Sequence, residues 1–544
     1  MTAAFDYVIV GAGTAGCVVA SRLSEAGDAT VLLLEAGGSD RTVWIQLPIG
    51  YGRTFFDRRI NWMYDTATVP GLGGRSSYWP RGKVIGGSGS INAMVYVRGQ
   101  PNDFDHWAQL GNHGWSYRDV LPFFRLSEDH DGGEDPHHGR GGPIHVTDIS
   151  RRAHPLCRVF VETATSLGFD ETSDFNGAQS EGVGVYQINT DRGRRASSAN
   201  AFLRPALRRA NLALRTRAHV TRILFEGRRA VGIEYRQGNR VQQVTARREV
   251  VLCGGTINSP QLLQLSGVGP AEHLRSIGVT LVLDAPAVGR NLQDHLAVSY
   301  FYRSSRPTLN QELGPWTGKV KAGLRYLADR GGPLSMSVNQ GGGFVRSDPG
   351  QARANLQLYF SPVSYTKTPL FERRLTHPDP FPGFLLSFNA CRPTSRGMLA
   401  IQSSDPFVHP IIAPNYLDTN KDVAEALAGV RLLRRLAASA PLSDIITAEI
   451  LPGAHLRSDD ELLQDFRDRA DTVYHPVGTC GMGPDPALSV VDSRLRVHGL
   501  EGLRVIDASI FPVITSGNTN APTVMVAEKG AAMVLEDARR RPAR

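Results

Sequence analysis

The sequence predicts an α/β protein, α+β overall, in which a lobe on a parallel sheet adjoins a lobe on an antiparallel sheet. The chain has 544 residues, more than one ordinary domain holds, so at least two lobes are expected. Residues 5–35 follow a strand–helix–strand pattern, which is typical of a parallel sheet. Between residues 301 and 469, stretches such as 356–360 and 383–388 are typical of antiparallel strands.

The N-terminal unit opens with an apolar strand over residues 5–10, which runs into a G-x-G-x-x-G turn over residues 11–16. A helical pattern follows, with small and apolar residues on one face, and Gly27 is expected to cap its C-terminus. A second apolar run, 30–34, stops at Glu35. Strand, turn, helix, strand and carboxylate in this order predict a Rossmann-like unit that binds a dinucleotide.

The glycines of this turn have distinct physical tasks. Gly11 permits the tight turn, Gly13 lets the backbone approach a pyrophosphate, and Gly16 lets helix and strand pack closely. The pyrophosphate would lie at the helix N-terminus, where free N–H groups and the helix dipole favour an anion. Glu35 would accept hydrogen bonds from the hydroxyls of an adenosine ribose. The alternative is a glycine-rich turn that binds no ligand.

Composition excludes several other classes of protein. The net charge of +8 comes mostly from arginines that are scattered along the chain, and no aromatic-interleaved basic stretch predicts a nucleic-acid groove. The five cysteines lie far apart without a C-x-x-C pair, which argues against a zinc site or a disulfide framework and favours free thiols in a reducing compartment. The histidines within 129–142 are expected to belong to an exposed loop, so no metal site is predicted.

Targeting signals are not expected either. The first strand begins within a few residues of Met1, which leaves no room for a signal peptide. No apolar run reaches about 18 residues, so the sequence predicts no integral membrane segment. A cytoplasmic protein is therefore expected.

A second stretch rich in small residues, P-R-G-K-V-I-G-G-S-G-S-I-N-A-M, covers residues 80–94. Small residues let backbone pass close to a flat ligand or an anion, although a flexible loop would have the same composition. Beside the first motif, it is more consistent with a second cofactor-contacting segment. It is similar to the first signature of the glucose-methanol-choline (GMC) oxidoreductases, FAD enzymes that oxidise alcohols.

Other segments carry the same resemblance, so that it covers essentially the whole chain. Residues 248–270 resemble the second signature of the family, and 288–295, 472–479 and 517–523 resemble further family segments. The closest similarity is to the choline-dehydrogenase-like branch. The resemblance implies an FAD-binding domain made of three parts of the chain and a substrate-binding domain made of two. The former takes residues 1–155, 191–300 and 470–544, and the latter takes 156–190 and 301–469.

The resemblance also implies which residues contact FAD. They lie in the two glycine-rich segments, in the strand near residue 220 and in the C-terminal segments: Gly11, Gly13, Thr14, Ala15, Gly16, Glu35, Ala36, Arg81, Val84, Gly89, Ser90, Asn92, Ala93, Met94, Val95, Val220, Tyr474, Asp507, Ala508, Asn518 and Thr519. Some relatives attach FAD covalently through a histidine just before the asparagine of the first signature. Ile91 takes that position here, so noncovalent FAD is expected.

Family matching implies that His475, in Y-H-P-V-G-T, is the catalytic base and that Asn518, in G-N-T-N-A-P-T, is its partner. A neutral imidazole can take the hydroxyl proton of an alcohol near neutral pH, with an ordinary pKa of about 6.5. The carbon then releases hydride to N5 of the flavin. Asn518 would hydrogen-bond the substrate oxygen. His295 is expected to be a packed, hydrogen-bonded histidine rather than a catalyst.

The resulting prediction is an FAD-dependent oxidation of a primary alcohol to the aldehyde. Choline-acting relatives carry a histidine where Tyr359 stands, which disfavours choline as the substrate. The electron acceptor could be oxygen, a quinone or a dye. The alternatives are an FAD-containing lyase of the same fold that cleaves cyanohydrins, and a flavin-bearing binding protein without turnover.

Overall fold

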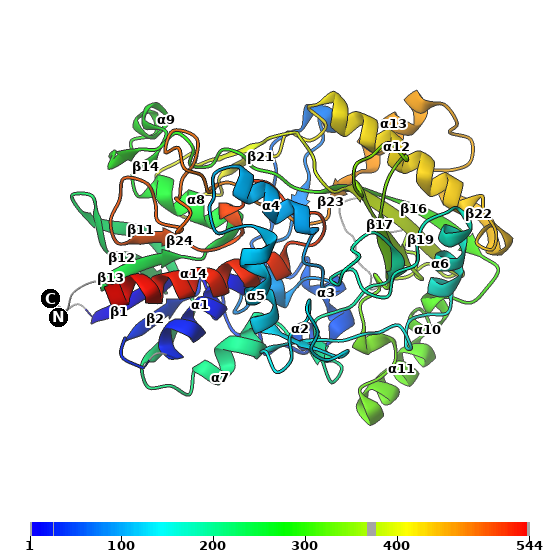
Figure 1. Cartoon of the computed structure of the whole chain (residues 1–544), viewed down its shortest axis with the longest axis horizontal. Coiled ribbons are helices and arrows are strands. Elements are labelled where there is room, and N and C mark those ends of the chain that lie inside the picture. The colour runs from blue at the N-terminus through cyan, green and yellow to red at the C-terminus, as the bar shows by residue number, and fades with distance from the viewer. Residues whose placement is uncertain (1–2, 26, 367–376, 541–544) are drawn as a thin grey trace.

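The computed structural model describes residues 3–25, 27–366 and 377–540, and its two lobes lie side by side along the long axis (Figure 1). Each lobe is built around one seven-stranded sheet. A buried apolar core surrounds each sheet, and a smaller cluster of buried aromatic and aliphatic side chains includes Tyr51, Phe55 and Val338. The two-lobed α/β architecture predicted from the sequence is confirmed.

The first sheet has its predicted parallel strands at its centre. Its strands run in the order β10 (Leu212–Arg215), β2 (Val31–Leu34), β1 (Ala3–Val10), β13 (Arg240–Leu252), β12 (Arg229–Gln237) and β11 (Ala218–Glu226), with β24 (Leu503–Val505) beside β13. The pairs that join β10, β2, β1, β13 and β24 are parallel, whereas β11, β12 and β13 pair antiparallel. The C-terminal strand β24 therefore completes the sheet that the N-terminus begins.

Helices from both ends of the chain pack together on this sheet. α1 (Thr14–Glu25) lies against α14 (Asn520–Arg540), and the two run side by side in Figure 1. Arg22 on α1 donates from Nε to Glu528 on α14 at 2.7 Å, and the Glu528 side chain is buried. α14 begins at Asn520 and carries Pro522 in its first turn, where the missing N–H of proline costs no helical hydrogen bond.

The second sheet is wholly antiparallel, as the alternating sequence pattern predicted. Its strands run in the order β22 (Ile446–Leu451), β16 (Leu296–Ser304), β19 (Gly383–Ala390), β18 (Leu356–Ser361), β17 (Gly341–Val345) and β7 (Gly182–Val185), with β23 (Asp471–Thr472) beside β16. The division of the chain into five domain segments stays a prediction.

Helices and short strands cover the two sheets. Helices α12 (Asn420–Ala437) and α6 (Leu156–Ser166) pack on the second sheet, beside α13 (Asp459–Arg469). The remaining helices are α2 (Val43–Gln46), α3 (Tyr51–Thr54), α4 (Pro101–Gln109), α5 (Tyr117–Ser127), α7 (Arg204–Ala206), α8 (Gly255–Leu265), α9 (Ala271–Ser276), α10 (Leu309–Leu313) and α11 (Trp316–Asp329). The other strand pairs are β3 (Tyr64–Asp65) with β4 (Tyr78–Trp79), β5 (Glu128–His130) with β6 (Ile144–Val146), β8 (Thr190–Asp191) with β9 (Arg194–Arg195), β14 (Val268–Gly269) with β15 (Leu283–Asp284), and β20 (Met398–Ala400) with β21 (Ile411–Ala413).

The expectation of an exposed loop over 129–142 is wrong for His138, which is buried. Its Nδ1 lies 3.0 Å from Glu128 and its Nε2 lies 2.7 Å from Asp174, while Arg98 donates to the same Glu128 at 2.6 Å. Burial lowers the pKa of His138, but the hydrogen bonds to the two carboxylates outweigh burial and raise it to about 9. The histidine is thus held inside the protein by an ion network that periodicity does not reveal.

The described residues contain no helix that is long and apolar enough to cross a membrane. They also contain no group of three or more His, Cys, Asp or Glu side chains placed to hold a metal ion.

Candidate active site

A cavity of about 350 Å³ lies where the two lobes meet, lined by residues of both sheets. From the first sheet come the ends of β1, β2 and β13, and from the second come Ser299, Tyr359 and Leu385. The C-terminal segment 473–476 closes a further part of the wall. The cavity therefore opens outside the carboxyl ends of the parallel strands, where ligands of open α/β sheets bind.

The first-sheet end of the cavity is walled by glycines that no larger residue could replace. Gly11 has φ +97°, and a Cβ there would lie 2.6 Å from the carbonyl oxygen of Cys253. A Cβ on Gly87 would lie 2.7 Å from Cα of Gly13, and one on Gly16 would lie 1.9 Å from the carbonyl oxygen of Gly11. This packing leaves bare backbone at the N-terminus of α1 facing the cavity, which suits a pyrophosphate.

Glu35 lies at the end of β2, buried in the same wall. Its two carboxylate oxygens accept from the backbone N–H groups of Ala12, at 2.9 Å, and Gly37, at 2.8 Å. Burial raises the pKa of Glu35 to about 7, although both backbone hydrogen bonds act in the opposite direction. The two N–H groups thus fix the orientation of the carboxylate, which is close to half-ionised at neutral pH. Its oxygens can accept further hydrogen bonds, such as those from ribose hydroxyls.

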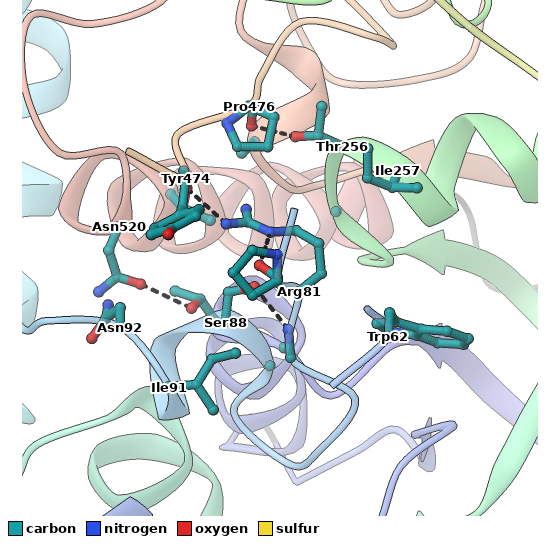
Figure 2. Close-up of a pocket in the computed structure, with 18 of the residues that line it drawn as sticks. Trp62, Arg81, Ser88, Ile91, Asn92, Thr256, Ile257, Tyr474, Pro476 and Asn520 are labelled. Carbon is teal, nitrogen blue, oxygen red and sulfur yellow. Dashed lines mark hydrogen bonds between the residues drawn. The ribbon is translucent and has the colours of Figure 1, made fainter. Parts of the chain in front are cut away.

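Most of the residues expected at FAD line this one cavity. They are Gly11, Gly13, Thr14, Ala15, Glu35, Ala36, Arg81, Asn92, Ala93, Met94, Val95, Val220, Tyr474, Asp507, Ala508, Asn518 and Thr519. Figure 2 shows Arg81 reaching toward Tyr474, whose carbonyl oxygen accepts from Arg81 at 2.8 Å, and Asn92 near Ile91.

Four of the expected residues lie behind the lining rather than in it. Gly16 packs on the turn itself, and Val84 is buried in a cluster that includes Ile91. Gly89 lies against the Thr14 side chain, and the Ser90 hydroxyl donates to the carbonyl of Ile85 at 2.8 Å. These residues shape the wall from behind.

His475 belongs to a chain of hydrogen bonds that crosses the wall. Its Nδ1 lies 3.0 Å from Nδ1 of His295, and Nε2 of His295 lies 2.9 Å from the carbonyl oxygen of Cys391. A carbonyl only accepts, so Nε2 of His295 carries a proton and its Nδ1 is the acceptor of the neutral ring. Nδ1 of His475 must then donate, which leaves Nε2 of neutral His475 as a free acceptor.

Asn518 meets that free nitrogen. Its Nδ2 lies 3.1 Å from Nε2 of His475, and its Oδ1 accepts from Nε2 of Gln357 at 3.2 Å. Gln357 also lies 3.4 Å from the hydroxyl of Tyr186. The amide of Asn518 is therefore oriented by the second sheet, and His475 and Asn518 present their polar atoms to the cavity together.

The electrostatics of this end favour a neutral imidazole. Burial, His295 and Arg81 together lower the pKa of His475 well below its ordinary value of 6.5. Burial also lowers the pKa of His295 to about 4. The expectation of a pKa near 6.5 for His475 is therefore wrong, because the ring is buried and its neighbours are a second histidine and a guanidinium.

Two large side chains beside the cavity have left-handed backbone. Tyr474 has φ 70° and Met94 has φ 63°, and both belong to the cluster around Tyr51. Positive φ is unfavourable for residues with bulky side chains, by about 1–3 kcal/mol each, and such strain concentrates at functional sites. The left-handed backbone at Tyr474 orients the adjacent residue, His475.

Comparison with known proteins agrees with this geometry. Family models described as GMC oxidoreductase match residues 5–297 and 393–527. The chain belongs to the GMC oxidoreductase family. An alcohol dehydrogenase [acceptor] of Pseudomonas putida is 42% identical over 538 residues, 98% of this chain and 96% of that protein. The mitochondrial choline dehydrogenase of Homo sapiens is 42% identical over 542 residues, 97% of this chain and 89% of that protein.

Solved structures give the same result. Pyridoxine 4-oxidase from Mesorbium loti superposes with a TM-score of 0.88 at 32% identity, covering 99% of this chain and 100% of that one. Formate oxidase from Aspergillus oryzae gives a TM-score of 0.91 at 26% identity over 99% of both chains. This GMC oxidoreductase is an FAD enzyme that acts on CH–OH donors, and the glycine wall and Glu35 fit the pyrophosphate and ribose of FAD.

Sequence reasoning missed the residues that hold His475 and Asn518 in this GMC oxidoreductase. His295 was expected to be packed and hydrogen-bonded, which is confirmed, but its contact with His475 spans 180 positions of the chain. Gln357 reaches Asn518 across 161 positions. No local pattern carries such contacts, because they depend on how the second sheet meets the C-terminal segment.

Proposed function

We propose that this enzyme oxidises a primary alcohol to the aldehyde, with Nε2 of His475 as the base and Asn518 as the donor that orients the alcohol oxygen. The observation that supports this role is the hydrogen-bond chain from the Cys391 carbonyl, which leaves Nε2 of His475 unprotonated and facing the cavity. A substrate hydroxyl that replaces the contact between His475 and Asn518 could donate to the first and accept from the second.

The remaining residues prepare this step. FAD, when bound, supplies the two-electron acceptor for the hydride. His295 holds His475 in one tautomer, and Gln357 holds the Asn518 amide in one orientation. Asp294 accepts from the backbone N–H of His475 at 2.7 Å, which fixes the strained segment from the other side.

For the substrate we propose a neutral alcohol with an apolar or aromatic substituent. The cavity is also lined by Phe55, Tyr359, Tyr365, Val338 and Leu385, and of these Phe55, Val338 and Tyr365 belong to one apolar cluster with Tyr474, the neighbour of His475. Of the described lining residues, only Glu35 and Asp507 carry carboxylates, and both belong to the first-sheet side. A cationic alcohol would find no counter-ion in these walls near the base.

Noncovalent FAD is part of the proposal. Ile91 stands where some relatives carry the linking histidine, and its side chain lines the cavity beside Asn92 (Figure 2). Acid precipitation should leave a yellow supernatant and a colourless pellet. Flavin that stays with the pellet would contradict this part.

The test of the function is an anaerobic reduction screen. The holoenzyme is mixed with benzylic, furanic, aliphatic and polyol alcohols and with choline, and flavin absorbance is followed. We expect bleaching by neutral aromatic or aliphatic primary alcohols and little by choline. Turnover of a cyanohydrin without bleaching by any alcohol would instead favour the lyase, and faster reduction by choline would contradict the proposed substrate class.

A further inference from the structure

Helix α11 presents a stripe of large apolar side chains to solvent. Trp316, Val320, Leu324 and Leu327 keep 75%, 50%, 63% and 72% of their surface exposed. Their spacing of four, four and three residues places them within an arc of about 80° on one helix face. The large apolar side chains of both cores are buried, so a continuous exposed stripe requires a reason.

The stripe is not the face by which α11 attaches to the protein. The inward face carries the buried Ala322 and Tyr326, and the Tyr326 hydroxyl donates to the carbonyl of Gly193 at 3.0 Å. A Cβ on Gly193 would lie 2.3 Å from the Arg330 carbonyl, so the β8–β9 hairpin packs tightly on the end of the helix. The stripe therefore points away from the protein, because the opposite face of α11 is the one that packs on it.

Basic side chains flank the stripe. Lys319 and Lys321 lie on opposite sides of it, each about 100° from its centre, and Arg325 lies further round the helix, about 140° from the centre; all three are exposed. The one acidic residue of α11 is Asp329, which lies about 180° from the centre of the stripe, on the opposite side of the helix. An apolar face with a tryptophan and basic flanks is the pattern of a helix that lies in the plane of a membrane surface.

The β8–β9 hairpin, which contacts α11 at this edge of the molecule, also contacts α2. Arg195 of the hairpin donates to the carbonyl of Ile45 in α2 at 2.9 Å. Val43 of α2 is 63% exposed. Exposed Arg192 and Arg194 lie between these helices on the hairpin. The β8–β9 hairpin thus contacts both helices and adds two exposed arginines beside them.

We propose that this edge docks on the surface of a bilayer that contains anionic phospholipids, with the α11 stripe inserted at the boundary of headgroups and acyl chains. Basic flanks complement the negative charge of such a surface, with about 1 kcal/mol for each Lys or Arg near it. They would repel one another in a symmetric contact between two copies. The stripe is one helix wide and about 17 Å long, so its area is far smaller than the ~800 Å² per partner of a stable dimer.

Docking in this orientation has a consequence for the cavity. α10 adjoins α11, and its residues Leu309 and Leu313 pack into the cluster that contains Val338 and Tyr365 of the cavity wall. The substrate side of the enzyme would then lie near the lipid, where apolar alcohols and apolar electron acceptors concentrate.

The test measures binding of the FAD-loaded enzyme to vesicles by co-sedimentation. Vesicles of phosphatidylcholine alone are compared with vesicles that contain about one third phosphatidylglycerol. The test variant is Leu324→Glu with Leu327→Glu. Its matched control is Val241→Glu with Leu488→Glu, where the side chains are 63% and 81% exposed on other parts of the surface. Flavin content and alcohol-dependent flavin reduction without vesicles verify that each variant is folded.

We expect the parent enzyme to bind the anionic vesicles, more weakly as salt rises, and to bind phosphatidylcholine poorly. The stripe variant should lose about tenfold in affinity per leucine, and the control should bind like the parent. Equal binding by the stripe variant and the control, or no binding by the parent at low salt, would overturn the proposal. So would light scattering that shows a dimer which only the stripe variant dissociates, since the stripe would then join two copies.

Discussion

The end of the cavity beside the first sheet is built from backbone, whereas the end beside the second sheet is built from side chains. At the first end, Gly11, Gly13 and Gly87 bring bare peptide groups together, and one carboxylate, Glu35, is fixed by two N–H groups. At the second end, His475 and Asn518 are held by side chains that are distant in the sequence, His295 just before β16 and Gln357 in β18. Changes at the first end should alter cofactor occupancy, and changes at the second end should alter rate.

The variant with the largest expected effect on rate is His475→Ala. It should keep its flavin, because the residue lies at the side-chain end, yet reduce it about 10²–10⁴-fold more slowly, since the proposed general base is removed. That loss corresponds to roughly 3–5.5 kcal/mol of barrier. Anaerobic stopped-flow absorbance measures it. His273→Ala, whose ring bonds to the Ile401 carbonyl away from the cavity, is the control. Near-normal reduction by His475→Ala would remove it from the mechanism.

Glu35→Ala tests the backbone end. Each hydrogen bond from a ribose hydroxyl to the carboxylate contributes roughly 1.5–3 kcal/mol, so FAD affinity should fall about 10–100-fold for each bond lost. The protein should purify largely as apoprotein, and added FAD should restore the parent rate of reduction. Full flavin content in Glu35→Ala would show that the adenosine lies elsewhere.

Protonation of Glu35 gives this end a pH dependence of its own. Its pKa is raised from 4.5 to about 7, so the free energy of unfolding that it contributes to the apoprotein is present below pH 4.5 and is lost as pH rises to 7. Ribose donors favour the ionised form, so FAD affinity should rise with pH up to about 7 and then level. Glu35→Gln should bind FAD more weakly and without this dependence, as titration calorimetry would measure. The same slope in Glu35→Gln would assign the titration to another group.

At the side-chain end, His295→Leu should slow flavin reduction about 10–100-fold while FAD is retained. The substitution leaves Nδ1–H of His475 without its acceptor, which costs about 1–3 kcal/mol. His475 is then no longer held in one tautomer. His295→Gln can offer a carbonyl oxygen to the same N–H, so part of the rate should return. Equal losses in both variants would indicate a role in packing alone.

The pH profile of the parent enzyme separates the two ends. Because the pKa of His475 lies well below 6.5, the base is already neutral there, and the rate of flavin reduction at saturating FAD should be flat from about pH 6.5 to 8. A rise centred at pH 6.5 would mean that the base is exposed to water when it works.

The smallest expected effect is that of Tyr359→Phe. Its hydroxyl is buried and has no hydrogen-bond partner among the described residues. Removing it should raise the thermal midpoint slightly, by the relief of about 1 kcal/mol or more. KM should change less than tenfold, and only for alcohols with a second polar group that the hydroxyl can reach. A large loss of kcat for a simple alcohol would give Tyr359 a part in the reaction itself.

The same contrast explains what could be predicted from the sequence. Gly11, Gly16 and Glu35 act within one strand–helix–strand unit, so their spacing alone predicts their task. His475 and Asn518 were found only through their resemblance to family motifs, and the residues that hold them, His295 and Gln357, come from separate parts of the chain. His138 was placed in a loop for the same reason, because Glu128 and Asp174 enclose it only in the folded protein.

The carbonyl of Cys391 gives the hydrogen-bond chain a closed end. A proton that reaches His475 can shift as far as His295. A backbone carbonyl cannot pass it on, so the hydrogen-bond chain exchanges protons only with the cavity. The proton must leave by the route along which it arrived. We therefore expect His475 to lose its proton only after the aldehyde has left the cavity. Proton release and product release should then occur together.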